Sequence, residues 1–491
     1  MKLARLLSDA GLTTDGATDV EVTGFAIDNR KVAPGTVFGA FQGSTVNGED
    51  FIADAVTAGA VAVVARPEAR VEGALHVQDA TPRRAFAQLA ARFFTPVPAH
   101  IVAVTGTNGK TSTVEMTRQI WRMAGERAAS IGTLGVTTPD ESVSTGLTTP
   151  DVVTFLGNLS GLAREGVTHL AFEASSHGLD QYRNEGVRSE AVAFTNFSRD
   201  HLDYHTDMDV YFAAKMRLFD EVAADGAAAV IWTGEHADKW TGRAVEHAQR
   251  AGLKVMTVGE RGQAIRLVKR EPTQLGQALT IEYGGAQKTI NLPLIGAYQA
   301  ANALVAAGLA LATEIEAARV WDALGRLQPV RGRLERAVIT PAGAPAYVDY
   351  AHTPDAIEAA IAALRPHVHG RLITVVGAGG DRDHGKRGPM GATAAAGSDL
   401  LIVTDDNPRG EDPAQIRAAV MEGAGDGARE IGDRRQAICA AIAEAGREDI
   451  VLIAGKGHEQ GQIVGRGTEV RILPFDDVTV ARECAAGKGA A

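Results

Sequence analysis

The chain has 491 residues, of which 45% are hydrophobic and 22% are charged, a composition typical of a folded globular protein. This length is too great for one hydrophobic core, so we expect about three domains of ordinary size. The formal net charge of −11 argues against nonspecific nucleic-acid binding. An anionic ligand would therefore have to be held by local groups of donors.

The sequence carries no pattern for export or membrane insertion. The amino terminus reaches Asp9 before an apolar segment of signal-peptide length develops. No apolar run attains the roughly 18–20 residues that a membrane span needs. The two cysteines, Cys439 and Cys484, lie in different surroundings, and we expect neither a disulfide framework nor a metal site from them. These features predict a cytoplasmic protein.

Three blocks of predicted elements follow one another along the chain. Residues 1–97 combine short strands with helical segments and end at the breaker FFTPVPAH. Over residues 98–329 apolar runs of strand length alternate with helical segments, and the alternation restarts over residues 330–491. Such alternation predicts an α/β fold with mainly parallel sheets covered by helices on both faces. Ligands bind such sheets beyond the carboxyl ends of the strands.

The strongest local signal in the central block is the segment IVAVTGTNGKTS. An apolar strand runs into a loop in which Gly106 and Gly109 let backbone amides wrap phosphate oxygens, and a helix follows. Lys110 would supply a point charge, and Thr111 could ligate magnesium. The strict phosphate-loop pattern requires glycine where this chain has Val104, so a glycine-rich turn without a ligand is the alternative. The order of strand, loop and helix favours a triphosphate site.

Other polar residues of the central block allow two interpretations each. Glu173, at the end of a strand, is either a structural acid or a hard ligand for a second magnesium ion. His201 and His205 lie four residues apart, but no cysteine or glutamate-rich partner set supports zinc. Taken alone, Lys215 in YFAAK is an ordinary solvated helix residue, and Asn302 is a buried, satisfied amide.

The third block adds charged residues near its strand ends. Arg333 and Asp349 could serve as a cation for phosphate and a carboxylate for ribose or metal, or each could belong to a structural ion pair. The segment TDDNPRGEDP follows the apolar run DLLIV. It is either a solvated turn or a loop in which Pro408 stiffens the backbone and presents Arg409 to a ligand.

Eight segments in this chain order resemble those of the Mur ligases over about residues 22–480: TGTNGKTS, SSHGLDQYR, TNFSRDHLDYH, AAK, VDYAHTPDA, GDRDHGKR, DNPR and AGKGHE. The resemblance implies the three-domain Mur ligase architecture. Residues 1–97 would form a mixed α/β domain that binds the UDP-muramoyl substrate. Residues 98–329 would form the central P-loop ATPase domain with its parallel sheet, and residues 330–491 a Rossmann-like domain that binds the amino acid.

The resemblance also implies an activity in peptidoglycan biosynthesis. The enzyme would use ATP and Mg²⁺, with two ions, to join meso-2,6-diaminopimelate to the D-glutamyl γ-carboxylate of UDP-N-acetylmuramoyl-L-alanyl-D-glutamate through an acyl phosphate. It would act as a monomer without nucleic acid or membrane insertion. Three alternatives stay open, namely a ligase that adds L-lysine, a ligase like folylpolyglutamate synthetase, and a P-loop binding protein without ligase activity.

Residue roles follow from the same resemblance. Lys110, Lys215, Glu173 and His201 would be catalytic, and Lys215 would carry a carboxyl group from carbon dioxide (N6-carboxylysine), which requires a neutral amine. Thr111, Glu173, His201 and Lys215 would surround the metal ions. ATP would be held by Gly106, Thr107, Asn108, Gly109, Lys110, Thr111, Ser112, Asn302, Arg333 and Asp349. The UDP-muramoyl dipeptide would contact Ile27, Asn29 (where the family commonly has serine), Ser44, Thr45, Val46, Thr148, Thr149, Ser175, Gln181 and Arg183.

The incoming amino acid would be recognised by its charges. A guanidinium matches the planar geometry of a carboxylate, so Arg409, with Arg382 as a second cation, would bind the distal carboxylate that distinguishes diaminopimelate from lysine. Glu459 and the Gly455 carbonyl would accept the distal ammonium group. The whole set comprises Arg382, Asp406, Asn407, Pro408, Arg409, Gly455 and Glu459.

Overall fold

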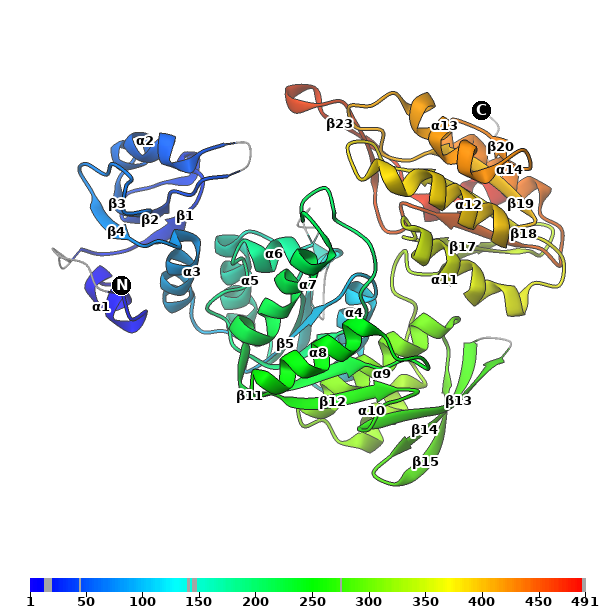
Figure 1. The fold of residues 1–491 in the computed structure, drawn as a ribbon, viewed down its shortest axis with the longest axis horizontal. Coiled ribbons are helices and arrows are strands. Elements are labelled where there is room, and N and C mark those ends of the chain that lie inside the picture. Colours follow the sequence, from blue (N-terminus) through cyan, green and yellow to red (C-terminus); the bar gives the residue numbers. More distant parts are fainter. Residues whose placement is uncertain (13–19, 44–45, 139–141, 144–147, 274–275, 488–491) are drawn as a thin grey trace.

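A computed structural model describes residues 1–491 except 13–19, 44–45, 139–141, 144–147, 274–275 and 488–491. The described chain forms a small, a large and a medium-sized sheet in succession, each with its own helices (Figure 1). The predicted α/β class is confirmed. Ser44 and Thr45, predicted to contact the nucleotide end of the substrate, lie outside the described residues. In the part of the chain that is described, no helix has both the length and the apolar character needed to cross a membrane.

The first sheet has four parallel strands in the order β1-β2-β3-β4. Helix α3 begins with Pro82, whose fixed φ suits a first helical position. From α3 the fully buried Phe86 packs edge-on against Phe25 and Phe41, with ring centroids 5.4 and 5.5 Å apart. The elements are α1 (Leu3–Asp9), β1 (Gly24–Ala26), β2 (Thr36–Gly39), α2 (Ile52–Thr57), β3 (Ala60–Ala65), β4 (Leu75–Gln78) and α3 (Pro82–Phe93).

The second sheet has eleven strands in the order β15-β14-β13-β12-β11-β10-β5-β9-β6-β7-β8. Its centre is parallel, as predicted, and the central strands consist mostly of buried apolar residues, as expected for a parallel sheet. Its strands are β5 (His100–Thr105), β6 (Ala128–Gly132), β7 (Gly135–Thr137), β8 (Ser142–Val143), β9 (His169–Glu173), β10 (Ser189–Phe194), β11 (Ala223–Trp232), β12 (Lys254–Gly259), β13 (Ile265–Thr273), β14 (Gly276–Tyr283) and β15 (Ala286–Leu292). Its helices are α4 (Lys110–Met123), α5 (Val152–Arg164), α6 (Ser176–Asp180), α7 (Met208–Arg217), α8 (Lys239–Arg250), α9 (Ala297–Ala312) and α10 (Ala317–Leu324). The antiparallel edges β7–β8 and β14–β15 were not predicted.

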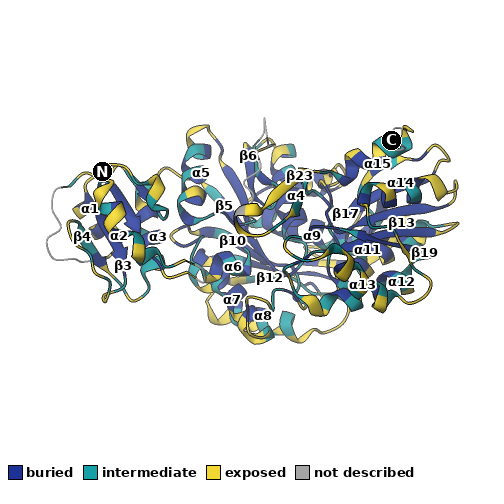
Figure 2. Cartoon of the chain, turned by 90° about the horizontal axis from the view of Figure 1, so that it is seen from above, coloured by how far each residue is buried: buried dark blue, intermediate teal, exposed yellow. Residues whose placement is uncertain are grey.

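The third sheet has six strands in the order β16-β17-β21-β18-β19-β20, of which only β16 is antiparallel to its neighbour among the described strands. Figure 2 shows buried residues concentrated in the strands and exposed residues on the outer faces of helices and on loops. The strands are β16 (Glu335–Ile339), β17 (Pro345–Asp349), β18 (Leu372–Ala378), β19 (Leu400–Asp405), β20 (Arg429–Glu430) and β21 (Ile450–Ala454), with a separate hairpin of β22 (Gly461–Val464) and β23 (Arg471–Pro474). The helices are α11 (Pro354–Leu364), α12 (Arg387–Gly397), α13 (Pro413–Ala424), α14 (Arg434–Glu444) and α15 (Asp477–Ala485).

The two cysteines form a disulfide, so the expectation that they would not pair is wrong. Cys439 on α14 and Cys484 on α15 are 45 residues apart in sequence, and their Cα atoms are 5.1 Å apart. The sequence surroundings differ because the residues belong to different helices. The two helices pack side by side against the same sheet, which brings the thiols together.

Phe172 offers a test of the packing that supports the central sheet. It is fully buried on β9 and packs against Phe155 of α5, with ring centroids 5.0 Å apart. We expect Phe172→Ala to lower the free energy of unfolding by about 3–5 kcal/mol, because the cavity cannot close completely. Phe172→Leu, which keeps most of the volume, should lose only about 1–1.5 kcal/mol. Denaturant unfolding followed by fluorescence measures both, and equal losses would contradict this packing.

Candidate functional site

A cavity of about 1190 Å³ lies between the second and third sheets. Its walls include Thr133 and His201 from the second sheet's loops and Arg409 and Glu459 from the third's. These residues follow the carboxyl ends of parallel strands, which is where open α/β sheets bind ligands. The carboxyl ends of strands from both sheets therefore face the same cavity.

The loop between β5 and α4 has the backbone of a phosphate-binding loop. Gly106 has φ of 145° and Gly109 has φ of 86°, conformations that glycine adopts without strain. A Cβ atom on Gly106 would lie 2.0 Å from Thr195 Oγ1, so a side chain is excluded. Thr195 Oγ1 also donates to the Asn108 carbonyl at 2.6 Å. The loop precedes the helix amino terminus, where backbone N–H groups attract anions.

Lys110 is the cation of this loop. Its Nζ donates to the backbone carbonyls of Gly106 at 2.9 Å and Thr107 at 2.8 Å. Burial lowers the pKa of Lys110, while Glu173 opposes this shift. Thr107 and Ser112 belong to the same loop and first helical turn, and both are buried. The predicted phosphate-binding residues 106–112 are thus contiguous in space.

Glu173, at the end of β9, is surrounded by hydrogen-bond donors. Thr111 Oγ1 donates to Oε2 at 3.0 Å, and the Thr133 amide donates to Oε1 at 2.7 Å. Arg333 Nη2 in turn donates to Thr111 Oγ1 at 3.0 Å, although 222 residues separate them. Burial raises the pKa of Glu173, and Lys110 opposes that rise. A carboxylate and a hydroxyl beside a phosphate loop form a hard oxygen donor set that suits Mg²⁺.

Lys215 is buried in α7 rather than solvated, so the interpretation of this residue as an ordinary surface lysine is wrong. Only 1% of the residue is exposed, and its Nζ donates to the Gly106 carbonyl at 2.7 Å. The Nζ atom of Lys215 lies 4.4 Å from the ring centre of Tyr211. Burial, reinforced by Lys110, holds the pKa of Lys215 well below its ordinary value. A neutral amine is therefore accessible close to the phosphate loop.

His201 occupies a neighbouring position with a strained backbone. Its φ is 54°, and its amide donates to Asp200 Oδ1 at 2.9 Å. Burial lowers the pKa of His201 to about 3, even though Asp200 opposes this shift. The imidazole is thus neutral at physiological pH, which is the form that ligates metals.

Three predicted nucleotide contacts lie around the loop. The Asn302 side chain from α9 packs against Gly109, since a Cβ atom there would lie 2.3 Å from Asn302 Oδ1. Asp349 Oδ2 accepts from the Leu334 amide at 2.6 Å, and burial raises the pKa of Asp349 to about 6. The Arg333 guanidinium lies 4.5 Å from the ring centre of Tyr350.

The predicted dipeptide-binding residues of the second sheet gather beside Glu173. Thr149 Oγ1 donates to the Glu173 carbonyl at 2.9 Å, and Arg183 Nη1 donates to the Thr149 carbonyl at 2.7 Å. Arg183 also donates to Gln181 Oε1 at 2.8 Å, while Ser175 Oγ caps α6. Thr148 lines the cavity.

The remaining predicted contacts of this substrate belong to the first sheet. Ile27 packs against its core, Asn29 lies in the short helical turn after β1, and 58% of Val46 is exposed. None of these three lines the cavity as the described residues define it. The structure therefore separates these three residues from the cavity.

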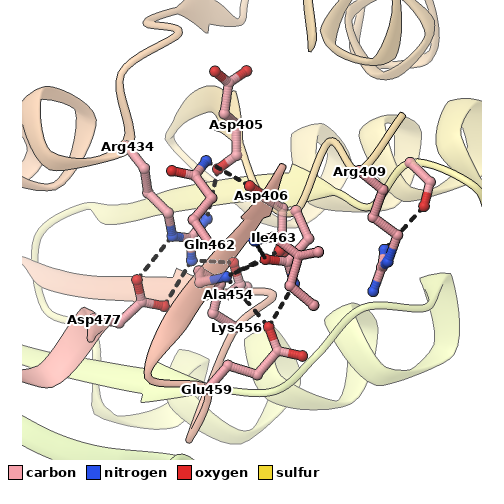
Figure 3. A network of polar contacts seen from close by, with 12 residues as sticks. Asp405, Asp406, Arg409, Arg434, Ala454, Lys456, Glu459, Gln462, Ile463 and Asp477 are labelled. Carbon is pink, nitrogen blue, oxygen red and sulfur yellow. Dashed lines mark hydrogen bonds and ion pairs between the residues drawn. The ribbon is translucent and has the colours of Figure 1, made fainter. Parts of the chain in front are cut away.

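The loop after β19 is not a solvated turn. Asp406 and Asn407 are 7% and 3% exposed, and the Arg409 backbone pairs with Val464 of β22, while its side chain extends beside Asp406 (Figure 3). The Arg409 amide donates to Ile463 in β22 at 3.0 Å, and the Gly465 amide donates to the Arg409 carbonyl at 2.7 Å. This pairing holds Arg409 at φ of 51°.

The Arg409 guanidinium extends along the cavity wall. Its Nη1 donates to the Gly380 carbonyl at 2.9 Å. Arg382, Gly455 and Glu459 line the same cavity, whereas Pro408 does not. Within the described chain no carboxylate lies within ion-pair distance of Arg409, so its charge remains accessible to an anionic ligand.

Sequence reasoning missed three residues of this site. Thr133, which contacts Glu173, follows β6 in the segment IGTLG. A glycine and a threonine directly after a predicted strand could have indicated a binding residue. Tyr211 lies one helical turn before Lys215, a spacing that sequence alone does not distinguish from core packing. Lys456 is buried beneath the cavity wall, and a lysine in a glycine-rich strand exit gives no sign of that burial.

The sequence matches three families along its length. Residues 21–94 match the family described as "Mur ligase family, catalytic domain". Residues 104–310 match "Mur ligase middle domain", and residues 332–457 match "Mur ligase, glutamate ligase domain".

Individual relatives extend this similarity to the whole chain. The chain is 58% identical over 482 residues to the UDP-N-acetylmuramoyl-L-alanyl-D-glutamate–2,6-diaminopimelate ligase of Zymomonas mobilis subsp. mobilis, with 98% of each chain covered. It is 50% identical over 481 residues to the protein of that name from Bradyrhizobium diazoefficiens, with 97% of each covered. A solved structure of a ligase of that name superimposes with a TM-score of 0.71 at 31% identity and covers 99% of each chain. The protein therefore belongs to the Mur ligase family.

Proposed function

We propose that the protein is an ATP-dependent ligase that joins meso-2,6-diaminopimelate to the D-glutamyl γ-carboxylate of UDP-N-acetylmuramoyl-L-alanyl-D-glutamate in peptidoglycan biosynthesis. The main observation behind this proposal is that one cavity is lined both by Thr133, which contacts Thr111 of the phosphate loop, and by Arg409 of the amino-acid pocket. The names of the relatives that match nearly the whole chain support the same substrates. A cytoplasmic monomer is the form we infer.

The domain roles follow the three sheets. We infer that residues 1–97 hold the UDP-muramoyl end of the substrate, with Ile27, Asn29 and Val46 as contacts. Residues 98–329 would bind ATP, and residues 330–491 would bind the amino acid. The separation of the first sheet's residues from the cavity suits a long substrate whose reactive carboxylate lies far from its nucleotide.

The donor groups beside the loop fit Mg²⁺ and a modified lysine. Thr111 and Glu173 supply hard oxygens, and His201 supplies a neutral imidazole. Lys215 supplies the deprotonated amine that carbon dioxide needs, and its carboxylated form would add an oxygen ligand. We infer that two Mg²⁺ ions would be held among Thr111, Glu173, His201 and carboxylated Lys215. When bound, the ions would neutralise phosphate charge.

The reaction begins with an anion attacking an anion. The γ-carboxylate oxygen attacks the γ-phosphorus of ATP, ADP leaves, and an acyl phosphate forms. Lys110 and Arg333 would reduce the repulsion, because both cations lie at the loop before the substrates meet. Thr148, Thr149, Ser175, Gln181 and Arg183 would hold the dipeptide that carries this carboxylate.

The second step forms the amide. The neutral amine of diaminopimelate attacks the acyl carbon, and inorganic phosphate leaves from the tetrahedral intermediate with the electron pair of the broken bond. The amine loses its proton to the departing phosphate or to solvent as the amide forms. No side-chain nucleophile is required, so the contribution of the chain is orientation and charge.

Diaminopimelate recognition would depend on complementary charges. Arg409 and Arg382 would bind the distal carboxylate, and Glu459 with the Gly455 carbonyl would accept the distal ammonium. Lysine lacks that carboxylate and would leave a partly buried guanidinium unpaired, which is costly. A preference for diaminopimelate of roughly 10³-fold or more follows.

An ADP-release assay tests this function. ADP should appear only when the UDP-muramoyl dipeptide and meso-diaminopimelate are both present. Release with L-lysine in its place would indicate a lysine-adding enzyme. Release with a folate substrate would indicate a folylpolyglutamate synthetase, and release without either acceptor would indicate a binding protein with incidental hydrolysis.

Lys110 should be essential for phosphoryl transfer. We expect Lys110→Ala to lower kcat about 10²–10³-fold, because the phosphates lose a fixed counter-charge in a water-poor site. The matched control is Lys254→Ala on β12, an exposed lysine that should retain full activity. Lys110→Ala activity within tenfold of wild type would contradict the phosphate-loop assignment.

Lys215 should be required in its carboxylated form. We expect Lys215→Ala to be nearly inactive and to regain part of its activity when short-chain carboxylic acids are added. In the wild type, falling pH protonates the amine as it passes through the lowered pKa, so carboxylation and activity should decline together. Activity without added acid in Lys215→Ala would disprove the proposed modification.

Arg409 should determine the choice of amino acid. We expect Arg409→Ala to lower kcat/KM for diaminopimelate by a factor that corresponds to about 2–4 kcal/mol of transition-state stabilisation. The kcat/KM for lysine should fall much less, because only diaminopimelate offers a distal carboxylate. The matched control is Arg250→Ala on α8, which does not line the cavity and should leave both substrates unchanged. An unaltered preference in Arg409→Ala would refute this role.

A further inference from the structure

Lys456 is a fully buried lysine that has no role in the reaction steps proposed above. It follows β21, and its exposed fraction is 0%. Lysine is almost never fully buried unless it is paired. Lys456 does not line the cavity as the described residues define it, so its effect on a ligand must pass through its neighbours.

Those neighbours are residues of the amino-acid pocket. The Lys456 ammonium donates to Asn407 Oδ1 at 2.8 Å and to Glu459 Oε2 at 3.3 Å, and it lies 3.6 Å from Asp406 Oδ1 (Figure 3). Asp406, Asn407 and Glu459 all line the cavity. One buried cation thus contacts three pocket residues from behind.

Lys456 helps to set the orientation of the Asn407 amide. Its Oδ1 accepts from Lys456 and also from the Ile463 amide at 2.9 Å. Its Nδ2 donates to Glu459 Oε2 at 2.7 Å. Because the ammonium and the Ile463 amide can only donate, together they fix which end of the Asn407 amide faces Glu459. The carboxylate of Glu459 is thereby held by two donors on one oxygen.

The same cation sets the charge of the pocket floor. Two carboxylates, Asp406 and Glu459, and one ammonium leave a net charge of −1, which matches a single ligand ammonium group. Burial raises the pKa of Glu459, Asp406 raises it further, and Lys456 lowers it. Without the lysine, the neighbouring Asp406 would raise the pKa of Glu459 unopposed by this cation.

Other charged and titratable groups face Glu459 from neighbouring elements. Arg409 lies on the loop after β19, Tyr350 follows β17, and Arg434 begins α14. Arg434 is already paired with Asp477 at 2.7 Å, and Arg409 faces the cavity. Lys456 is the cation that Glu459 contacts directly within the described chain.

We propose that Lys456 is a positioning residue for amino-acid recognition, which holds Asn407 and Glu459 in the orientation and charge balance that receive the distal ammonium of diaminopimelate. This inference rests on the proposed function. It assigns Lys456 no contact with the substrate. Its loss should therefore change the KM for the amino acid and leave the KM values for ATP and the UDP-muramoyl dipeptide unchanged.

Lys456→Met tests this role because it keeps the length of the side chain and removes the charge. We expect the KM for meso-diaminopimelate to rise at least about 30-fold, since breaking a buried charge pair costs the remaining partner its counter-ion. The acid limb of kcat/KM for diaminopimelate should move to higher pH, because Glu459 loses the cation that lowers its pKa. Lys288→Met on β15, an exposed lysine, is the matched control and should behave like wild type.

A double-mutant cycle separates this role from a general structural one. In a Glu459→Gln background, Lys456→Met should cost only about two- to threefold in KM, since the carboxylate it acts through is gone. If Lys456 were merely structural, Lys456→Met would raise the KM for diaminopimelate by the same factor in both backgrounds and would also change the KM for ATP. If Lys456→Met does not fold, Lys456→Gln keeps a donor for Asn407 without the charge and should still shift the acid limb.

The outcomes distinguish this inference from the function on which it rests. A wild-type enzyme without diaminopimelate-dependent ADP release would overturn the proposed function. An active wild type, together with a Lys456 variant whose diaminopimelate KM and acid limb are unchanged, would overturn the positioning role alone. An equal rise in the diaminopimelate KM on Lys456→Met in the wild-type and Glu459→Gln backgrounds would also overturn the positioning role.

Discussion

The hydrogen bond from Arg333 to Thr111 connects the two halves of the site. Arg333 precedes the third sheet, and Thr111 lies in the first turn of α4, the helix that follows the phosphate loop of the second sheet. Thr111 donates onward to Glu173, so one chain of contacts runs from a cation through a hydroxyl to a buried carboxylate. The facing of the two sheets across a shared cavity depends on contacts of this kind, because each sheet alone presents only half of the required groups.

Burial prepares the charged groups of this site for chemistry. Glu173 and Asp349 have raised pKa values, while Lys215 and His201 have lowered ones, and desolvation is the first cause in every case. Charged groups that are removed from water in this way interact strongly with a bound metal ion or phosphate of opposite charge. The same water-poor surroundings make each fixed cation more effective when anions meet.

Buried cations also lie at the strand ends of the third sheet. Arg434, 2% exposed, donates to Asp477, to the Ala454 carbonyl at 3.0 Å and to the Asp405 carbonyl at 3.3 Å, which ties α14 to the ends of β19 and β21 (Figure 3). Lys456 connects the loops that follow those two strands. Two buried cations thus fix the strand ends from which the loop of Arg409 emerges, and pairing with β22 holds the backbone of Arg409 itself.

The sequence by itself determined the α/β class, the parallel order of the central strands and the phosphate loop, because apolar runs, glycine positions and the charge of Lys110 are local properties. Motif order also indicated the family. The tertiary structure decided what depends on contacts between distant segments. It buried Lys215, brought Arg333 to Thr111 and paired Cys439 with Cys484. It also placed Lys456 behind the amino-acid pocket. Burial and long-range pairing arise when helices and sheets pack together, and no single segment of sequence encodes them.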